Sequence, residues 1–185
     1  MNSTLTLELP TTTVLHVTPQ QFEELAVANP DLRLERTSQG ELIVNPPTGG
    51  ESRKRNFSIT GQLSNWFEAN EELGEGFDSS GGFILPNGAT RSPDASWVRR
   101  ERWEALTPEQ RRGFVPLCPD FVVELRSASD SLSKLQEKMQ EYLENGARLG
   151  WLINPQNQRV EIYRPGQMVD VLEHPTQLSG EDVLP

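Results

Sequence analysis

The stretch PDFVVELRSASD (residues 119–130) decides the fold predicted from this sequence. Its apolar run, FVVEL, is short and rich in β-branched and aromatic residues, which indicates a buried central strand. Glu124 interrupts the run, and a charge inside an apolar strand costs several kcal/mol unless it is paired or bound to a metal. Because side chains alternate along a strand, Glu124 shares its face with Val122. Glu124 therefore either belongs to a site or pairs with Arg126 on the same face.

The segments after this strand predict a helix and further strands. Residues 129–146 have apolar side chains at helical spacing, with Ser129 or Asp130 as the N-cap and Gly146 as the C-cap. The run LGWLINP then reads as a second core strand, and RVEIYRP and MVDVL as a final hairpin. A strand, a helix and another strand in this order favour an α/β fold.

The segments before the central strand extend the same alternation. A helix is predicted from Thr18-Pro19 to Asn29-Pro30, followed by a hairpin of LRLER and ELIVN. In its first strand Leu32 and Leu34 alternate with Arg33 and Glu35, as in a half-buried strand. Residues 51–70 read as an amphipathic helix, residues 74–100 as short strands between turns, and residues 100–112 as one or two short charged helices. We therefore predict a loose arm over residues 1–13 and one α/β domain over residues 14–185. In that domain, helices flank a mixed sheet and an N-terminal helix and hairpin come first.

Composition narrows the class of protein. The chain has 185 residues, one Cys, two His and a formal net charge of −10. The single Cys excludes an internal disulfide framework and a Cys-based metal site, and the two distant His residues argue against a His-rich one. No apolar run is long enough to span a bilayer and no secretory signal opens the chain, which predicts a soluble cytoplasmic protein with no membrane partner. The acidity argues against unspecific binding of nucleic acid. Nine of the 17 basic residues nevertheless lie between Arg53 and Arg112, so a local basic face is possible.

The remaining candidates for a functional site are carboxylates on the predicted strands. The chain lacks a P-loop, a GxGxxG turn, HExxH and GxSxG, and a Ser/His/Asp triad would have to use a His near one end of the chain. Asp94 follows Pro93 and opens the strand DASWV, while Glu124 ends its own strand. If the two strand ends are adjacent, these oxygens form a hard site that suits Mg²⁺ or Mn²⁺. Such an ion lowers the pKa of a bound water and neutralises charge on a phosphoryl oxygen.

These residues carry a family resemblance. The pair Pro93-Asp94 followed by ELRS at residues 124–127 resembles the PD-(D/E)XK nuclease superfamily. More closely, the chain is similar to a bacterial family of restriction endonuclease-like proteins of unknown function. The resemblance covers about residues 15–175 and rests on SPDASWV, PDFVVELRSASD, KLQEKMQEYLENG and GWLINP in this order. It implies a restriction-endonuclease-like fold and metal ligation by Asp94 and Glu124.

The resemblance also implies a third acidic ligand. Glu51 stands where the family has an acidic residue at the start of its first core helix. On a helical wheel Glu51 lies roughly 100° from the apolar stripe, at the flank of the buried face. The alternative is a first-turn Glu that favours the N-terminus of its helix and holds no metal.

The chain departs from the superfamily at the catalytic Lys. Arg126 stands two residues after Glu124, and a guanidinium can neutralise charge on a phosphate but cannot act as a base. Lys138 lies about 95° from the centre of the apolar stripe of its helix, close enough to lean over the sheet edge. The resemblance points to the same residue, because the family helix carries a Lys four residues before a Tyr. The alternative is a surface Lys paired with Glu137 or Glu141.

Taken together, the residues predict a Mg²⁺- or Mn²⁺-dependent endonuclease acting on DNA. Asp94, Glu124 and Glu51 hold the ion, Lys138 orients or deprotonates water, and Arg126 offsets charge on the scissile phosphate. The residues expected to bind the DNA backbone are Arg53, Lys54, Arg55, Arg91, Arg99 and Arg100. A homodimer is expected from the resemblance alone.

Two other functions are compatible with the sequence. One is an inactive nuclease fold that serves as a binding or assembly module, which the net charge and Arg126 favour. The other is a sugar hydrolase that uses Asp94 and Glu124 as an acid/base pair without a metal.

Overall fold

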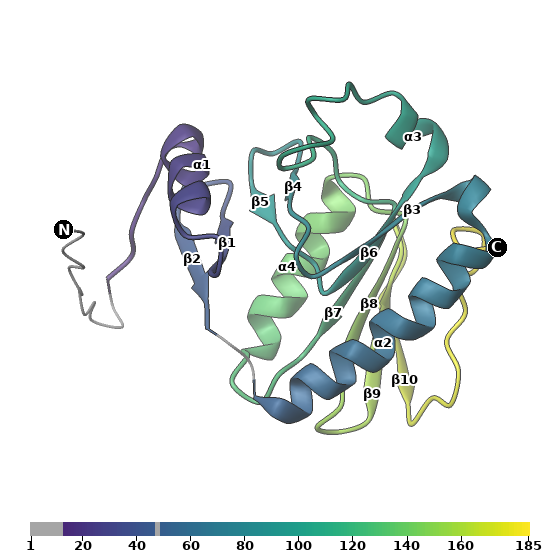
Figure 1. The fold of residues 1–185 in the computed structure, drawn as a ribbon. Helices are drawn as coiled ribbons and strands as arrows, with labels where there is room; N and C mark the ends of the chain where they lie inside the picture. The colour runs from purple at the N-terminus through teal and green to yellow at the C-terminus, as the bar shows by residue number, and fades with distance from the viewer. Residues whose placement is uncertain (1–12, 47–48) are drawn as a thin grey trace.

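The computed structural model describes residues 13–46 and 49–185, so all but Thr13 of the arm predicted for residues 1–13 lies outside the described part. The described chain folds into two β-sheets with four α-helices (Figure 1). The helices are α1 (Pro19–Ala28), α2 (Gly50–Ala69), α3 (Arg100–Glu104) and α4 (Leu132–Glu144), and a short 3₁₀ turn spans Glu71–Leu73.

The larger sheet has six strands in the order β10-β9-β8-β7-β6-β3. β7 and β8 run parallel and all other neighbours in this sheet are antiparallel. The parallel pair is joined through α4, which is the crossover that two parallel neighbours require. The strands are β3 (Gly74–Asp78), β6 (Ala95–Arg99), β7 (Phe121–Leu125), β8 (Leu149–Asn154), β9 (Arg159–Tyr163) and β10 (Asp170–Glu173).

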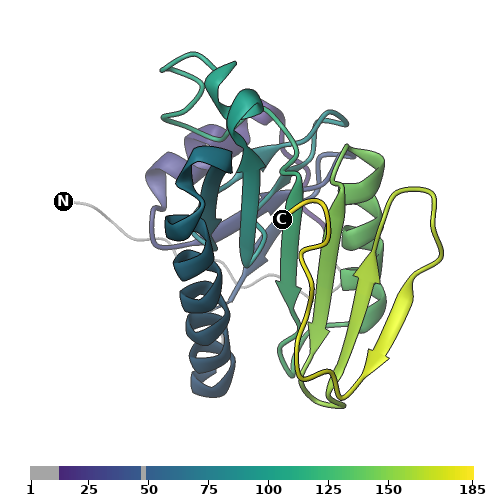
Figure 2. The same ribbon diagram turned by 90° about the vertical axis from the view of Figure 1, so that its right-hand side faces the viewer.

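Helices α2 and α4 cover opposite faces of this sheet (Figure 2). Alternation along β7 divides its side chains between two cores. Val122 packs with Met139 and Tyr142 of α4, and Phe121 and Val123 pack in the core that contains Leu63 of α2. Because Glu124 shares its face with Val122, as the sequence predicts, it points to the side of the sheet that α4 covers.

A second, four-stranded sheet joins the N-terminal hairpin to the middle of the chain. Its order is β2-β1-β5-β4, with β1 (Arg33–Arg36), β2 (Leu42–Asn45), β4 (Phe83–Ile84) and β5 (Thr90–Arg91). The predicted hairpin is confirmed, but the sequence did not indicate its partner: Arg36 of β1 pairs with Thr90 of β5. This pairing holds β1 next to the segment that leads into Asp94.

One local prediction is confirmed in part and another is wrong. Of the one or two short helices predicted over residues 100–112, α3 alone forms, and it ends before Thr107-Pro108. The residues after it form turns. The N-cap of α4 is Ser131 rather than Ser129 or Asp130, because Asp130 instead accepts the N–H of Ser127 and closes a turn.

Candidate active site

Asp94 and Glu124 lie together where β6 begins and β7 ends. Ala95 pairs with Val123 in the antiparallel ladder, so the residues before β6 run beside the end of β7. The N–H of Asp94 donates to the carbonyl of Val123 at 2.9 Å, and Asp94 Oδ2 accepts the N–H of Leu125 at 2.8 Å. The two carboxylates predicted from the sequence are therefore on neighbouring strands at one end of the sheet.

Lys138 reaches this pair from α4. Its Nζ lies 2.7 Å from Oε1 of Glu124, and its side chain is 12% exposed. Tyr142, one turn further along α4, donates from its hydroxyl to the same Oε1 at 3.0 Å. Residues four apart on a helix lie on one face, which explains why both side chains meet Glu124. Glu124 therefore does not pair with Arg126, and Lys138 does not pair with its helix neighbours.

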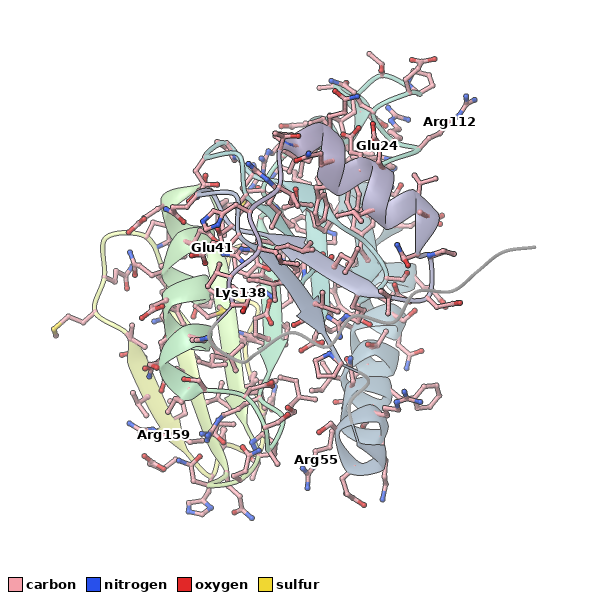
Figure 3. All side chains as sticks on the ribbon, turned by 90° about the vertical axis from the view of Figure 1, so that its left-hand side faces the viewer. Glu24, Glu41, Arg55, Arg112, Lys138 and Arg159 are labelled. Carbon is pink, nitrogen blue, oxygen red and sulfur yellow. The ribbon has the colours of Figure 1, made fainter. Side chains whose placement is uncertain are left out.

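Glu35 of the N-terminal hairpin completes the cluster, and the sequence did not indicate it. Its Oε1 lies 2.8 Å from Lys138 Nζ, and its side chain is 4% exposed. The alternation of LRLER suggested a buried Leu32 and an exposed Glu35, but Leu32 is 47% exposed, whereas Leu34 and Glu35 are both buried. The strand is covered on both sides, so alternation alone could not place the Glu. In Figure 3, Lys138 lies on the part of α4 beside the hairpin.

The pKa values of the two Glu residues that contact Lys138 shift in opposite directions. Burial raises the pKa of Glu124 to about 7, and the nearby Asp94 and Glu35 carboxylates add to this rise against the effect of Lys138. Burial also opposes ionisation of Glu35, but Lys138 and Arg91 hold its pKa below the usual value. Burial would lower the pKa of Lys138, whereas Glu124 and Glu35 raise it well above its usual value. Lys138 is therefore a fixed ammonium at neutral pH.

Arg33 and Asn56 surround the other oxygen of Asp94. Both Nη atoms of Arg33 lie 3.5 Å from Asp94 Oδ1, and Asn56 Nδ2 donates to the same oxygen at 3.4 Å. Arg33 also reaches the carbonyl of Ser92 at 3.4 Å, and its side chain is 37% exposed. These contacts are long, so the guanidinium has donors left for another acceptor. Neither residue was singled out from the sequence.

Several predicted site residues lie elsewhere. Arg126 turns away and donates from Nε to the carbonyl of Asp130 at 3.2 Å. The side chain of Glu51 is 76% exposed and lies 3.7 Å from Arg55, which matches the alternative of a helix N-terminal residue. Arg91 is buried and its Nε lies 2.6 Å from Glu141, so it is not available to a DNA backbone.

The remaining predicted DNA-binding residues form two groups. Arg53, Lys54 and Arg55 are exposed on α2, within one turn of Asn56. Around the helix Arg53 lies about 60° from Asn56 and so flanks the site, whereas Lys54 lies about 160° from it and faces away. Arg99 and Arg100 lie at the opposite end of β6 from Asp94, about 17 Å along the strand. Arg100 is also paired with Glu75 at 2.6 Å. Of the two groups, only the one on α2 is next in sequence to a residue that contacts Asp94, namely Asn56. Arg55 is labelled in Figure 3, near the start of this helix.

The donor set suits a hard divalent cation. Among residues 13–46 and 49–185, no three His, Cys, Asp or Glu side chains are grouped as a metal site, so the protein offers two carboxylates here. Mg²⁺ commonly binds one or two carboxylates and keeps several waters. Burial is the main cause of the raised pKa of Glu124, and the carboxylates of Asp94 and Glu35 add to it, so a cation beside Asp94 and Glu124 would favour the ionised form of Glu124. These residues therefore fit the predicted ion.

Comparison with known protein families assigns the chain to one of them. Residues 19–185 match the Uma2 family, which is described as "Putative restriction endonuclease". The chain belongs to this family. The match includes α1, the N-terminal hairpin and every element of both sheets, so the hairpin that supplies Glu35 lies inside the Uma2 region.

A solved structure shares the Uma2 fold. It is that of a nuclease, itself called putative, of the DUF820 family from Anabaena variabilis ATCC 29413. The TM-score is 0.67 at 22% sequence identity, and the alignment covers 82% of each chain. At this identity the likeness shows the fold, which confirms the predicted nuclease-like α/β architecture. No curated protein matches the chain. Within the described residues, no helix is both long and apolar enough to cross a bilayer.

Proposed function

We propose that this Uma2 protein is a metal-dependent endonuclease that hydrolyses phosphodiester bonds in DNA. The observation that carries the proposal is the meeting of Asp94, Glu124 and Lys138, from three different elements, at one end of the sheet. Membership of a family described as restriction endonucleases supports a nuclease in general. Metal dependence is proposed from the chemistry of the site, and DNA as the substrate from the basic residues Arg53, Lys54 and Arg55 of α2.

Asp94 and Glu124 are the residues that would hold Mg²⁺ or Mn²⁺. When bound, such an ion would supply an activated water and neutralise charge on the scissile phosphate. Lys138 is held as an ammonium between two carboxylates, so its part is to stabilise negative charge in the transition state rather than to accept a proton. Of the two roles predicted for Lys138, deprotonating the attacking water is therefore not part of the proposal, whereas orienting that water is compatible with an ammonium.

Arg33 takes the place that the sequence suggested for Arg126. Its partly exposed guanidinium lies beside Asp94, whereas Arg126 is bonded to the carbonyl of Asp130. A guanidinium with free donors binds phosphate oxygens in a planar, bidentate fashion. The exposed Arg53, Lys54 and Arg55 would contact phosphates further along the strand. A homodimer remains a prediction from the family resemblance.

Nicking of supercoiled plasmid tests this function. The purified protein is incubated with Mn²⁺ or Mg²⁺, with EDTA as the metal-free control. We expect cleavage that EDTA abolishes and that falls by on the order of 10²-fold or more in Asp94→Asn and in Glu124→Gln. Asp120→Asn is a matched control, since Asp120 is buried and paired with Arg102 away from the site. Cleavage by both site variants at the parental rate would overturn the proposal.

The second candidate is a non-cleaving module with the same fold. The net charge of −10 and the turning away of Arg126 favour it. It predicts no nicking with either metal and no heat of Mn²⁺ binding by calorimetry. Metal binding that depends on Asp94 and Glu124 would exclude it.

A further inference from the structure

The N-terminal hairpin inserts a buried carboxylate into the site. Glu35 belongs to β1, yet its Oε1 lies 2.8 Å from Nζ of Lys138 on α4, more than 100 positions along the chain. Both side chains are nearly inaccessible, at 4% and 12% exposure. A buried charge is costly unless it is paired and its oxygens are hydrogen-bonded.

Glu35 is itself held on several sides. The N–H of Ser92 donates to its Oε1 at 2.8 Å, and Nη1 of Arg91 lies 3.5 Å from its Oε2. Arg91 in turn pairs with Glu141 of α4 at 2.6 Å. The carboxylate is therefore anchored to β5, to the segment before Asp94, and through Arg91 to the same helix that carries Lys138.

Lys138 needs such an anchor because its side chain is a flexible four-carbon stem with a single point charge. Its other contact, Glu124, would share its oxygens with a divalent cation under the proposed function. Glu35 is not one of the proposed metal ligands, and its carboxylate contacts only the cationic side chains of Lys138 and Arg91 and a backbone N–H. The ammonium thus keeps one fixed partner whatever Glu124 binds.

We propose that Glu35 is a positioning residue of the proposed nuclease, which fixes the Lys138 ammonium beside the scissile phosphate while Glu124 holds the metal. This inference rests on the proposed function. It makes the N-terminal hairpin part of the active site rather than an appendage of the nuclease core. Glu35 touches no substrate and acts only through Lys138.

A double-mutant cycle on cleavage tests this role. The kcat and KM of Glu35→Gln, Lys138→Met and the double variant are compared with those of the parent. The assays are run at saturating Mn²⁺ and at a temperature below the unfolding midpoint of every variant. We expect Glu35→Gln to lower kcat by about 10- to 100-fold with KM for plasmid DNA unchanged. In the Lys138→Met background the same change is expected to alter kcat by less than about twofold, because the two residues act as one unit.

Glu161→Gln is the matched control. Glu161 is also buried, and it accepts bonds from Gln136 at 2.9 Å and Tyr163 at 2.7 Å, but it lies on β9 outside the site. We expect its kcat to stay within about twofold of the parent. If Glu35→Gln does not fold, Glu35→Asp keeps the charge but withdraws it from Nζ, and the same loss of kcat at constant KM is expected.

The outcomes separate the two hypotheses. An inactive parent would overturn the proposed function and this inference with it. An active parent in which the effects of Glu35 and Lys138 multiply independently would overturn the inference alone, as would a loss in Glu161→Gln equal to that in Glu35→Gln.

Discussion

Nζ of Lys138 lies 2.7 Å from Oε1 of Glu124, although one residue belongs to a helix and the other to the strand beneath it. The pair is buried against the α4 face of the sheet, where water cannot screen the charges. Removal of either partner therefore changes both stability and the electrostatics of the site.

Replacement of Lys138 by Met should destabilise the protein. The change leaves the carboxylates of Glu35 and Glu124 buried without their ammonium, and breaking a buried pair costs about 3–5 kcal/mol. Urea unfolding at pH 8 measures the free energy of unfolding. Lys134→Met is the control, because Lys134 is exposed on the same helix and should change the free energy by less than about 0.5 kcal/mol. Equal effects of the two variants would contradict the buried network.

The ionisation of Glu124 should make stability depend on pH. Its pKa is raised from about 4.5 to about 7 by burial, so the folded protein binds this proton more tightly than the unfolded chain does. The stabilisation is complete below about pH 4.5 and is lost as the pH rises through about 7. Glu124→Gln lacks this titration. Its free energy of unfolding relative to the parent should therefore increase by about 1–3 kcal/mol between pH 5 and pH 8, measured by urea unfolding in EDTA. A difference that does not vary with pH would argue against a raised pKa.

Arg33 should matter more to cleavage than Arg126. The guanidinium of Arg33 lies beside Asp94, whereas that of Arg126 donates a hydrogen bond to the carbonyl of Asp130. We expect Arg33→Gln to reduce plasmid nicking by on the order of 10²-fold, and Arg126→Gln to change it by about twofold or less. Initial rates at saturating Mn²⁺ give the comparison. The reverse order would restore the role that the sequence suggested for Arg126.

The hydroxyl of Tyr142 should affect the site as well as stability. Tyr142→Phe removes a hydrogen bond to Glu124, and a bond to a charged group is worth about 1.5–3 kcal/mol. Tyr163→Phe removes an equivalent bond to Glu161 on β9 and serves as the control. Thermal unfolding should shift downward in both variants, but only Tyr142→Phe should change cleavage. A cleavage defect of the same size in Tyr163→Phe would show that loss of a buried bond anywhere is sufficient.

The order of elements was readable from local patterns. Pro19, Gly146 and the alternation of FVVEL each report on their own neighbourhood, and the predicted helices and strands around them are confirmed. The C-cap of α4 is Asn145 rather than Gly146, which follows it at a φ of 110°. The same local reasoning put Glu124 on the same strand face as Val122 and Lys138 at the flank of its helix. These predictions hold because helical and strand periodicity depend only on residues a few positions apart.

Only some residues of the candidate site could be predicted from the sequence. Asp94, Glu124 and Lys138 were identified because charges on apolar strands or at a helix flank stand out in the sequence, and because the family resemblance points to the same residues. Glu35 and Arg33 did not stand out, since a short strand with alternating charges resembles any half-exposed hairpin. What changed their environment was the pairing of Arg36 with Thr90, which no local pattern encodes.

The amino-acid sequence by itself thus determined which segments are helices and strands, which faces they bury, and that two acidic residues and a lysine require explanation. The tertiary structure alone decided which other charges meet them. It brought Glu35 and Arg33 of the hairpin to the site and turned Arg126 and Glu51 away from it. The physical reason is that local periodicity fixes the direction of a side chain, whereas its partners are set by contacts between elements far apart in the chain.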